Sequence, residues 1–173
     1  MRGKRGAGGT EAQTLFARWL RHEGWLVAAA GKRVKFQTSD LFGCLDALAL
    51  LDGDGEDTIV WGAQVTTAEG RHASSSERKK KLEAVVWPDA WRISLVNHER
   101  VPDPADRKHT LDYWRVQDLA LVVGGRSGAR AWEKPRAVLF SRAAVEESAL
   151  APRREREAME LEALRARVAA KNG

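Results

Sequence analysis

The chain has 173 residues, 43% of them hydrophobic and seven of them Trp, which is enough apolar surface for one domain with a single sizeable core. This composition excludes a chain that is disordered throughout. Its 29 Lys and Arg against 24 Asp and Glu give a net charge of +5, which is compatible with a polyanionic partner without requiring one.

A single cysteine, Cys44, excludes an intramolecular disulfide and a zinc site built from cysteines. No apolar stretch approaches the roughly 20 residues that span a bilayer, and the first residues lack the apolar core of a signal peptide. We therefore expect a cytoplasmic protein with no membrane partner.

Residues 1–9 predict a flexible basic arm, because Arg2, Lys4 and Arg5 stand among glycines. Such an arm suits contact with phosphate. A helix is predicted from Thr10, an N-cap residue, to Gly24, with Glu11 in its first turn. Its apolar residues recur at helical spacing and are Leu15, Phe16, Trp19 and Leu20.

Two apolar segments, Asp40–Leu51 and Ile59–Thr67, predict the strands of a hairpin joined at Asp52-Gly53-Asp54-Gly55. Because strand side chains alternate, Asp46 should share a face with Cys44 and Leu48, and Gln64 should share a face with Thr66. If the two faces coincide, an Asp, a Gln and a Thr meet on one side of the sheet. The Asp-rich turn lacks the closing Glu of a calcium loop and is interpreted as a plain turn.

The densest positive cluster of the chain follows the hairpin and consists of Arg71, His72, Arg78, Lys79, Lys80 and Lys81. Ser74, Ser75 and Ser76 offer N-caps for a helix that should run to about Val86, before Pro88. Cations at a helix start oppose the helix dipole, so the cluster predicts contact with phosphate rather than a role in helix stability.

The rest of the chain predicts three further strands and a helical end. The strands are Trp91–Val96, Tyr113–Val116 and Arg136–Phe140, and Trp114 and Trp132 are candidates for stacking on an exposed base. Residues 141–173 are predicted to be helical, with Pro152 separating a short helix from a charged one. The charged helix has a thin apolar stripe suited to a partner, most simply a second copy of the chain. The stripe consists of Met159, Leu161, Leu164 and Val168.

These features together resemble the PD-(D/E)XK nucleases, and within them the archaeal-type Holliday junction resolvases. The resemblance rests on Glu11 in a helix, the phrase Leu20-Arg21-His22-Glu23-Gly24-Trp25, Asp46 leading an apolar strand, and Gln64-Val65-Thr66. It spans about residues 3–96. It implies an α/β, restriction-endonuclease-like fold, a mixed central sheet flanked by helices, over residues 10–140, followed by a charged C-terminal helix.

The resemblance also implies a site for Mg²⁺ or Mn²⁺. Asp46 and Glu11 match the family's strand Asp and helix Glu, and the carbonyl oxygens of Gln64 and Val65 would complete the ligands. Asp40 has the same strand parity as Asp46 and is the alternative ligand. Gln64 is alternatively interpreted as a buried amide bonded to the backbone.

The sequence departs from the family where Gln64-Val65-Thr66 replaces Glu-x-Lys. Thr66 has no positive charge with which to stabilise charge developing on phosphate. Some nucleases of this group take that lysine from the next helix, which here points to Lys81, with Lys79 as the alternative.

The function expected from this resemblance is a metal-dependent DNA endonuclease acting on branched DNA. The alternative is a catalytically inactive DNA-binding module with the same fold, and a third option is an interaction protein that works through its C-terminal helix. The expected DNA contacts are Arg2, Lys4, Arg5, Arg71, His72, Arg78, Lys79 and Lys80.

Overall fold

The computed structural model describes residues 8–30, 33–34, 37–38, 41–53, 56–67, 73–106, 108–123 and 128–172. The chain divides into two units, Met1–Ser141 and Arg142–Gly173. The elements in chain order are α1 (Gly8–His22), β1 (Leu26–Ala30), β2 (Arg33–Val34), β3 (Gln37–Thr38), β4 (Ala47–Gly53), β5 (Glu56–Thr67), α2 (Ala73–Glu83), β6 (Trp91–Pro102), β7 (Thr110–Leu121), β8 (Arg130–Trp132), β9 (Arg136–Phe140) and α3 (Arg142–Asn172).

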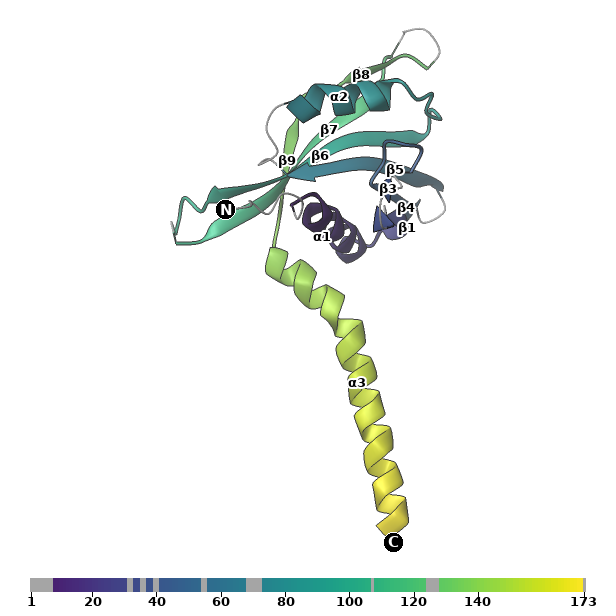
Figure 1. Ribbon diagram of the computed structural model, residues 1–173, viewed down its shortest axis with the longest axis vertical. Coiled ribbons are helices and arrows are strands. Elements are labelled where there is room, and N and C mark those ends of the chain that lie inside the picture. Colours follow the sequence, from purple (N-terminus) through teal and green to yellow (C-terminus); the bar gives the residue numbers. More distant parts are fainter. Residues whose placement is uncertain are drawn as a thin grey trace. The chain divides into compact units, whose positions relative to one another are not determined.

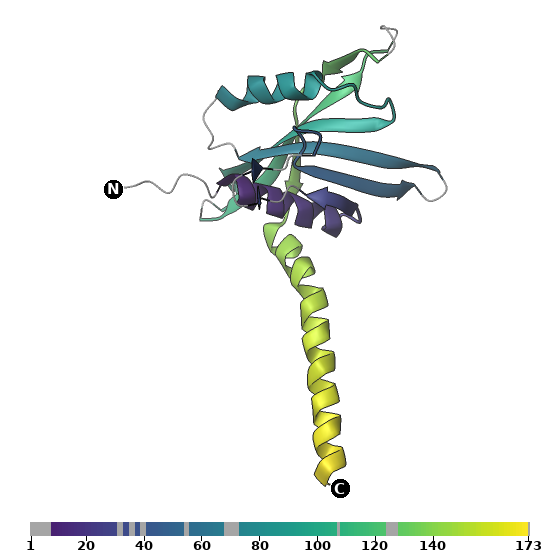
Figure 2. The same cartoon turned by 45° about the vertical axis from the view of Figure 1, so that its right-hand side comes forward.

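A seven-stranded mixed sheet forms the centre of the first unit. Its strands lie in the order β1-β4-β5-β6-β7-β8, and β9 also pairs with β7. Neighbouring strands are antiparallel except β5 and β6, which run parallel because α2 connects them as a crossover. The helices α1 and α2 lie on opposite sides of the sheet (Figures 1 and 2). The predicted α/β class, with a mixed central sheet and flanking helices, is therefore confirmed.

The helix α1 packs its apolar stripe on one face of the sheet. The ring centroid of Phe16 lies 5.6 Å from that of Trp61 in β5 and 5.1 Å from that of Trp114 in β7. Because side chains alternate along a strand, Ala63 and Val65 share this face with Trp61. The predicted stripe of Leu15, Phe16, Trp19 and Leu20 is buried throughout.

The end of α1 follows the predicted glycine signal. Gly24 has a φ of 86°, and the N–H of Trp25 donates to the carbonyl of Leu20 over 2.8 Å. This left-handed residue and its hydrogen bonds are the usual way in which glycine closes a helix.

The opposite face of the sheet packs against Leu82 of α2. A Cβ atom built on Gly62 in β5 would lie 2.8 Å from Leu45 Cδ1 and 3.1 Å from Ile93 Cδ1, so Gly62 belongs to this face. The lack of a side chain at Gly62 lets Leu45 approach the strand closely. The buried cluster on this side consists of Cys44, Leu45, Leu82, Trp87, Ile93, Leu95 and Leu119.

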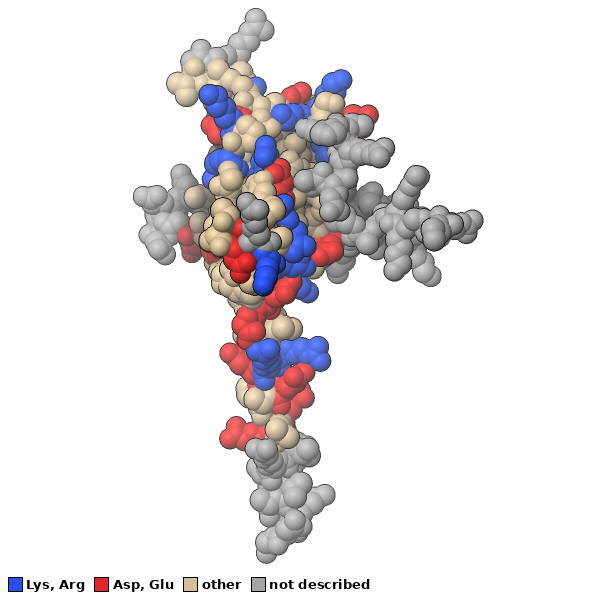
Figure 3. All heavy atoms as spheres, turned by 90° about the vertical axis from the view of Figure 1, so that its left-hand side faces the viewer, with Lys and Arg blue, Asp and Glu red and all other residues tan. Residues whose placement is uncertain are grey.

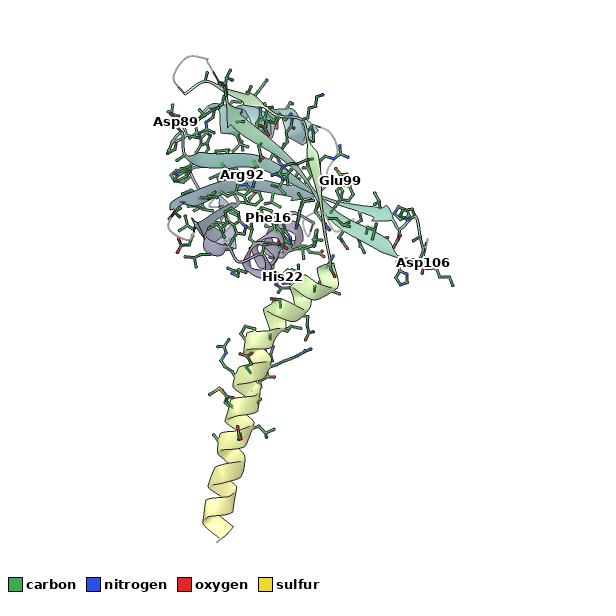
Figure 4. All side chains as sticks on the ribbon, turned by 180° about the vertical axis from the view of Figure 1, so that it is seen from behind. Phe16, His22, Asp89, Arg92, Glu99 and Asp106 are labelled. Atoms are coloured by element: carbon green, nitrogen blue, oxygen red, sulfur yellow. The ribbon has the colours of Figure 1, made fainter. Side chains whose placement is uncertain are left out.

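The helix α2 is shorter than predicted, and β6 and β7 are longer. α2 ends at Glu83 because the chain turns inward there, and Trp87 donates its indole N–H to the carbonyl of Leu82 over 2.7 Å. The strands β6 and β7 have 12 residues each and form a hairpin whose tip, near Asp106, is far from the turn at Asp89 (Figure 4). Their outer halves are polar and resemble loops in sequence, yet cross-strand pairs such as Arg115–Glu99, 2.7 Å apart, support them.

The second unit is the single helix α3, and the predicted break at Pro152 is wrong. Pro152 lies inside the helix, whose exposed surface lets water satisfy the carbonyl that proline leaves unbonded. Acidic and basic side chains alternate along its described part (Figure 3), and Arg142–Glu146 and Arg153–Glu157 pair one turn apart at 2.8 and 2.7 Å. Among the described helices, none has the length and apolarity needed to cross a membrane.

Candidate functional site

The carboxylate of Asp46 lies where α1, β4 and β5 meet. Its Oδ1 accepts a hydrogen bond of 2.5 Å from Gln13 Nε2 in α1, and its Oδ2 accepts one of 2.7 Å from the backbone N–H of Val65 in β5. The Asp46 residue is only 6% exposed. A buried carboxylate with such partners is held in one orientation.

Asp46 lies in a bend immediately before β4. Its backbone N–H donates to the carbonyl of Ala63 over 2.9 Å, although the ladder partner of Ala63 is Ala47. Asp46 is therefore held against β5 by its backbone but does not continue the regular ladder that begins at Ala47.

The side chains of Gln64 and Thr66 lie on the other face of the sheet, so the predicted meeting of Asp, Gln and Thr on one side does not occur. Gln64 follows Gly62 at the strand period of two and is the ladder partner of Leu95, which belongs to the cluster around Leu82. The physical reason is that Asp46 lies in the bend before β4, whereas unbroken alternation of the ladder would have placed it opposite Gln64.

Gln64 is buried, at 6% exposure, and its Oε1 has no hydrogen-bond partner among the described residues. The burial agrees with the predicted alternative of a buried amide, and a bond from its amide nitrogen to the backbone stays a prediction. The Thr66 hydroxyl makes a long bond of 3.4 Å to the carbonyl of Thr67.

Of the other predicted metal ligands, Val65 contacts Asp46 through its backbone N–H, and Glu11 lies on α1, the helix that also carries Gln13. The N–H and C=O of one strand residue point toward the same neighbouring strand, so the carbonyl of Val65 points, like its N–H, toward the β4 side and Asp46. Glu11 is exposed on α1, two residues before Gln13.

The oxygen donors near Asp46 are of the kind that Mg²⁺ and Mn²⁺ prefer, namely a carboxylate and a backbone carbonyl. In the part of the chain that the structure describes, no group of three or more His, Cys, Asp and Glu is arranged to hold a metal ion. Mg²⁺ commonly binds through one or two carboxylates together with water and substrate phosphate, so the donors fit the ion in kind.

The cations of α2 differ in their surroundings. Arg78 is half-buried, and its Nη1 is buried without a partner among the described residues. Lys79 Nζ lies 5.0 Å from the ring centroid of Trp132, a cation–π contact. Lys80 and Lys81 are exposed.

The two tryptophans proposed for base stacking are not equivalent. Trp114 is completely buried, so the prediction that it stacks on a base is wrong. Trp132 is half-buried, with Lys79 over its ring and its indole N–H donated to Glu83. The predicted site residues Arg2, Lys4, Arg5, Asp40, Arg71 and His72 lie outside the described residues.

Two polar clusters on the α1 side were not predicted from the sequence. His98 Nε2 lies 2.8 Å from Asp112 Oδ1, and Arg100 Nε lies 3.5 Å from the same oxygen. These residues come from β6 and β7 and meet only because of the hairpin register, which pairs Arg100 with Asp112.

The second cluster surrounds Asp118, whose carboxylate accepts hydrogen bonds from Ser94, Arg92 and Arg136. Arg92 also lies over the ring of Trp61, 3.9 Å from its centroid. Burial raises the pKa of Asp118 above its ordinary value, and the hydrogen bond from Ser94 partly offsets this.

Comparison with known proteins adds no assignment, since no family model, curated protein or solved structure matches the chain.

Proposed function

We propose that the chain is a metal-dependent DNA endonuclease whose site is centred on Asp46. The observation that supports this most is the pair of hydrogen bonds that Asp46 accepts from α1 and from Val65 in β5. Those contacts unite the three elements on which the resemblance puts the metal ligands of a nuclease, in the order helix, strand and strand.

The residues proposed to hold Mg²⁺ or Mn²⁺ are Asp46, Glu11 and the backbone carbonyl of Val65. When bound, the ion supplies Lewis-acid stabilisation of the phosphate and lowers the pKa of a water molecule that attacks it. Gln64 is left out of this set because its side chain lies on the other face of β5.

The chain's own residues fix the orientation of the Asp46 carboxylate. Gln13 Nε2 donates to one oxygen and the Val65 N–H donates to the other, so both ends of the carboxylate are held. Gln13 therefore acts as a positioning residue for Asp46, much as hydrogen bonds to metal-binding carboxylates generally do.

The test compares binding and cleavage on the same DNA. Labelled four-way junction, linear duplex and single strands are incubated with the full chain in Mg²⁺, Mn²⁺ or EDTA. We expect strand cleavage only with metal, and preference for the junction, which the resemblance implies. Cleavage that persists in EDTA would contradict the proposal.

A second function is a DNA-binding module without cleavage activity. Two observations favour it: both Asp46 oxygens already accept hydrogen bonds within the protein, and the position of the expected lysine is Thr66. DNA binding by the intact chain, without cleavage of any of the three substrates in either metal, would favour this module over the endonuclease.

A further inference from the structure

Phe42 occupies a backbone position that disfavours an aromatic side chain. The turn over residues 41–44 is closed by a hydrogen bond of 3.1 Å from the Cys44 N–H to the Leu41 carbonyl. Its two central residues, Phe42 and Gly43, have φ angles of 55° and 73°. Two left-handed residues in succession are typical of a type I′ turn, whose first central position is usually Asn, Asp or Gly. A bulky residue there is strained, so the turn itself gives no reason for a phenylalanine.

The hydrophobic core does not account for Phe42 either. The residue is 61% exposed, and Val86, which precedes Trp87 in the chain, is 97% exposed. An apolar side chain that stays in water gains little free energy from folding. A strained and exposed aromatic residue that suits neither its turn nor the core is a candidate for contact with a ligand.

The Phe42 ring is held by two tryptophans. Its centroid lies 6.0 Å from that of Trp87 and 6.0 Å from that of Trp91, at interplanar angles of 85° and 71°. The two tryptophan rings stack on each other, with centroids 6.2 Å apart and planes at 26°. Trp87 is itself fixed, since its indole N–H donates to the carbonyl of Leu82 over 2.7 Å. The protein therefore presents Phe42 to solvent in one orientation, which lowers the entropy cost of binding a flat ligand.

A basic helix end adjoins this aromatic cluster. Lys81 directly precedes Leu82, the residue that accepts the hydrogen bond of Trp87, and both Lys80 and Lys81 are exposed. Leu41 packs against the same buried cluster as Leu82, so the turn and the end of α2 lie on one side of the sheet. Aromatic surface next to exposed cations suits a strand of nucleic acid, because its bases have π-faces and its phosphates are anionic.

A single base matches the size of this surface better than a protein does. A stable protein interface buries about 800 Å² on each partner. The exposed apolar side chains around the turn are Phe42, Val86 and part of Trp91, which together present much less area than that. One aromatic ring is, by contrast, enough to stack on one base.

We infer that Phe42 stacks on an unpaired base of DNA, with Trp87 and Trp91 as its support. A base inside a continuous duplex is already stacked on both faces, so the site selects DNA whose bases are unpaired, as in a bubble or at a branch point. The inference rests on the DNA binding of the proposed function and assigns its preference for branched DNA to a residue.

The test compares a duplex that contains an unpaired central bubble with the same duplex fully paired, in EDTA to prevent cleavage. Phe42→Asn removes the ring and suits the left-handed turn, so we expect an unchanged or higher melting temperature of the protein. Affinity for the bubble, measured by fluorescence anisotropy at fixed salt, should fall roughly tenfold or more, as expected for a lost base stack. Affinity for the paired duplex should change by less than about twofold, because phosphate contacts are kept.

A second readout reports stacking directly. 2-Aminopurine placed in the bubble loses fluorescence when it stacks on an aromatic ring. Wild type should quench this fluorescence, Phe42→Asn should not, and Phe42→Trp should retain both the quenching and the affinity.

The matched control is Leu139→Thr, which removes a similarly exposed apolar side chain, 65% exposed, from β9. Thr suits a strand, so the fold should be retained. This variant should keep the wild-type preference for the bubble.

The outcomes separate this inference from the proposed function. If wild type binds both DNAs equally, or if Phe42→Asn keeps the preference for the bubble, the stacking site is refuted while DNA binding stands. A clear fall in melting temperature of Phe42→Asn without selective loss of binding would assign the ring to the fold and refute the site. Loss of a dimer in light scattering, again without selective loss of binding, would assign it to contact between copies. If wild type binds neither DNA, the proposed function and the stacking site both fail.

Discussion

Gln13 Nε2 donates a hydrogen bond of 2.5 Å to Asp46 Oδ1 and thereby ties the first turns of α1 to the start of β4. The contact joins residues that are 33 positions apart in the chain. Asp46 lies in the bend before β4, outside the regular ladder, where its carboxylate meets the helix. The proposed metal site and the packing of α1 therefore depend on the same side chain.

Removal of the Gln13 amide should destabilise the fold. We expect Gln13→Ala to lower the free energy of unfolding by about 1–3 kcal/mol, because a hydrogen bond to a buried charged group is lost. Arg18→Ala, on the exposed side of the same helix, is the control and should change it by less than about 0.5 kcal/mol. If urea unfolding gives the same loss of unfolding free energy for both variants, the Gln13–Asp46 contact does not contribute to stability.

Gln13→Glu places a second carboxylate against Asp46. Like charges at hydrogen-bond distance repel, so in EDTA this variant should melt at a lower temperature than wild type. A divalent cation that binds both carboxylates should remove this repulsion and restore the melting temperature. We therefore expect Mn²⁺ to raise the melting temperature of Gln13→Glu by more than that of Gln13→Leu. If Mn²⁺ raises the melting temperature of both variants equally, no cation binds beside Asp46.

Asp118 should make stability depend on pH in the acid range. Burial raises its pKa above 3.8, so in this range the folded state binds more protons than the unfolded chain. The stability gained from this group is therefore present at low pH and declines as pH rises from about 3.8 through the higher pKa of the folded state. The difference in unfolding free energy between wild type and Asp118→Asn should shrink over that range.

Urea unfolding of both proteins at several pH values measures this difference. If it instead grows as pH rises, Arg92 and Arg136 outweigh burial and lower the pKa of Asp118. Ser94→Ala removes the hydrogen bond that offsets burial and should shift the decline to higher pH.

Arg130 should hold the corner between α2 and β6. Its guanidinium donates to the carbonyls of Pro88, Leu119 and Trp91 over 2.7, 2.9 and 3.2 Å, and burial lowers its pKa. Arg130→Met leaves these carbonyls without their donor and should cost about 2–3 kcal/mol in urea unfolding. Arg130→Lys should recover little of this stability, because one ammonium group does not reproduce the several fixed donors of the planar guanidinium. Lys134→Met, an exposed neighbour in the chain, is the control and should be neutral.

The sequence was sufficient for those parts of the fold that follow from local rules. The spacing of Phe16 and Trp19 predicts the buried stripe of α1, and the glycine at 24 predicts its end. The strand Arg136–Phe140 has the predicted bounds. Each of these features depends on periodicity or on the conformational freedom of a single residue.

The parts that could not be predicted depend on contacts between distant segments. The face on which Asp46 lies follows from the point at which β4 begins, and a shift of one residue moves a side chain to the other side of a sheet. The pair of His98 and Asp112 needs the register of β6 and β7, which no local pattern gives. Pro152 fits within α3 because its fixed φ is already helical and solvent surrounds it.

The cleavage rate of Asp46→Asn, compared with that of wild type, tests the central claim most directly. Asn keeps the size of the side chain and removes the charge, so a metal ion at Asp46 loses its carboxylate ligand. Loss of several kcal/mol of transition-state stabilisation corresponds to a rate reduction of about 100-fold or more. Asp52→Asn, at an exposed position in β4, is the matched control and should cleave like wild type.

The measurement is made on labelled four-way junction in Mn²⁺, with circular dichroism confirming that each variant is folded. The account predicts cleavage by wild type and Asp52→Asn, and its near-complete loss in folded Asp46→Asn. Cleavage by Asp46→Asn at the wild-type rate would contradict it.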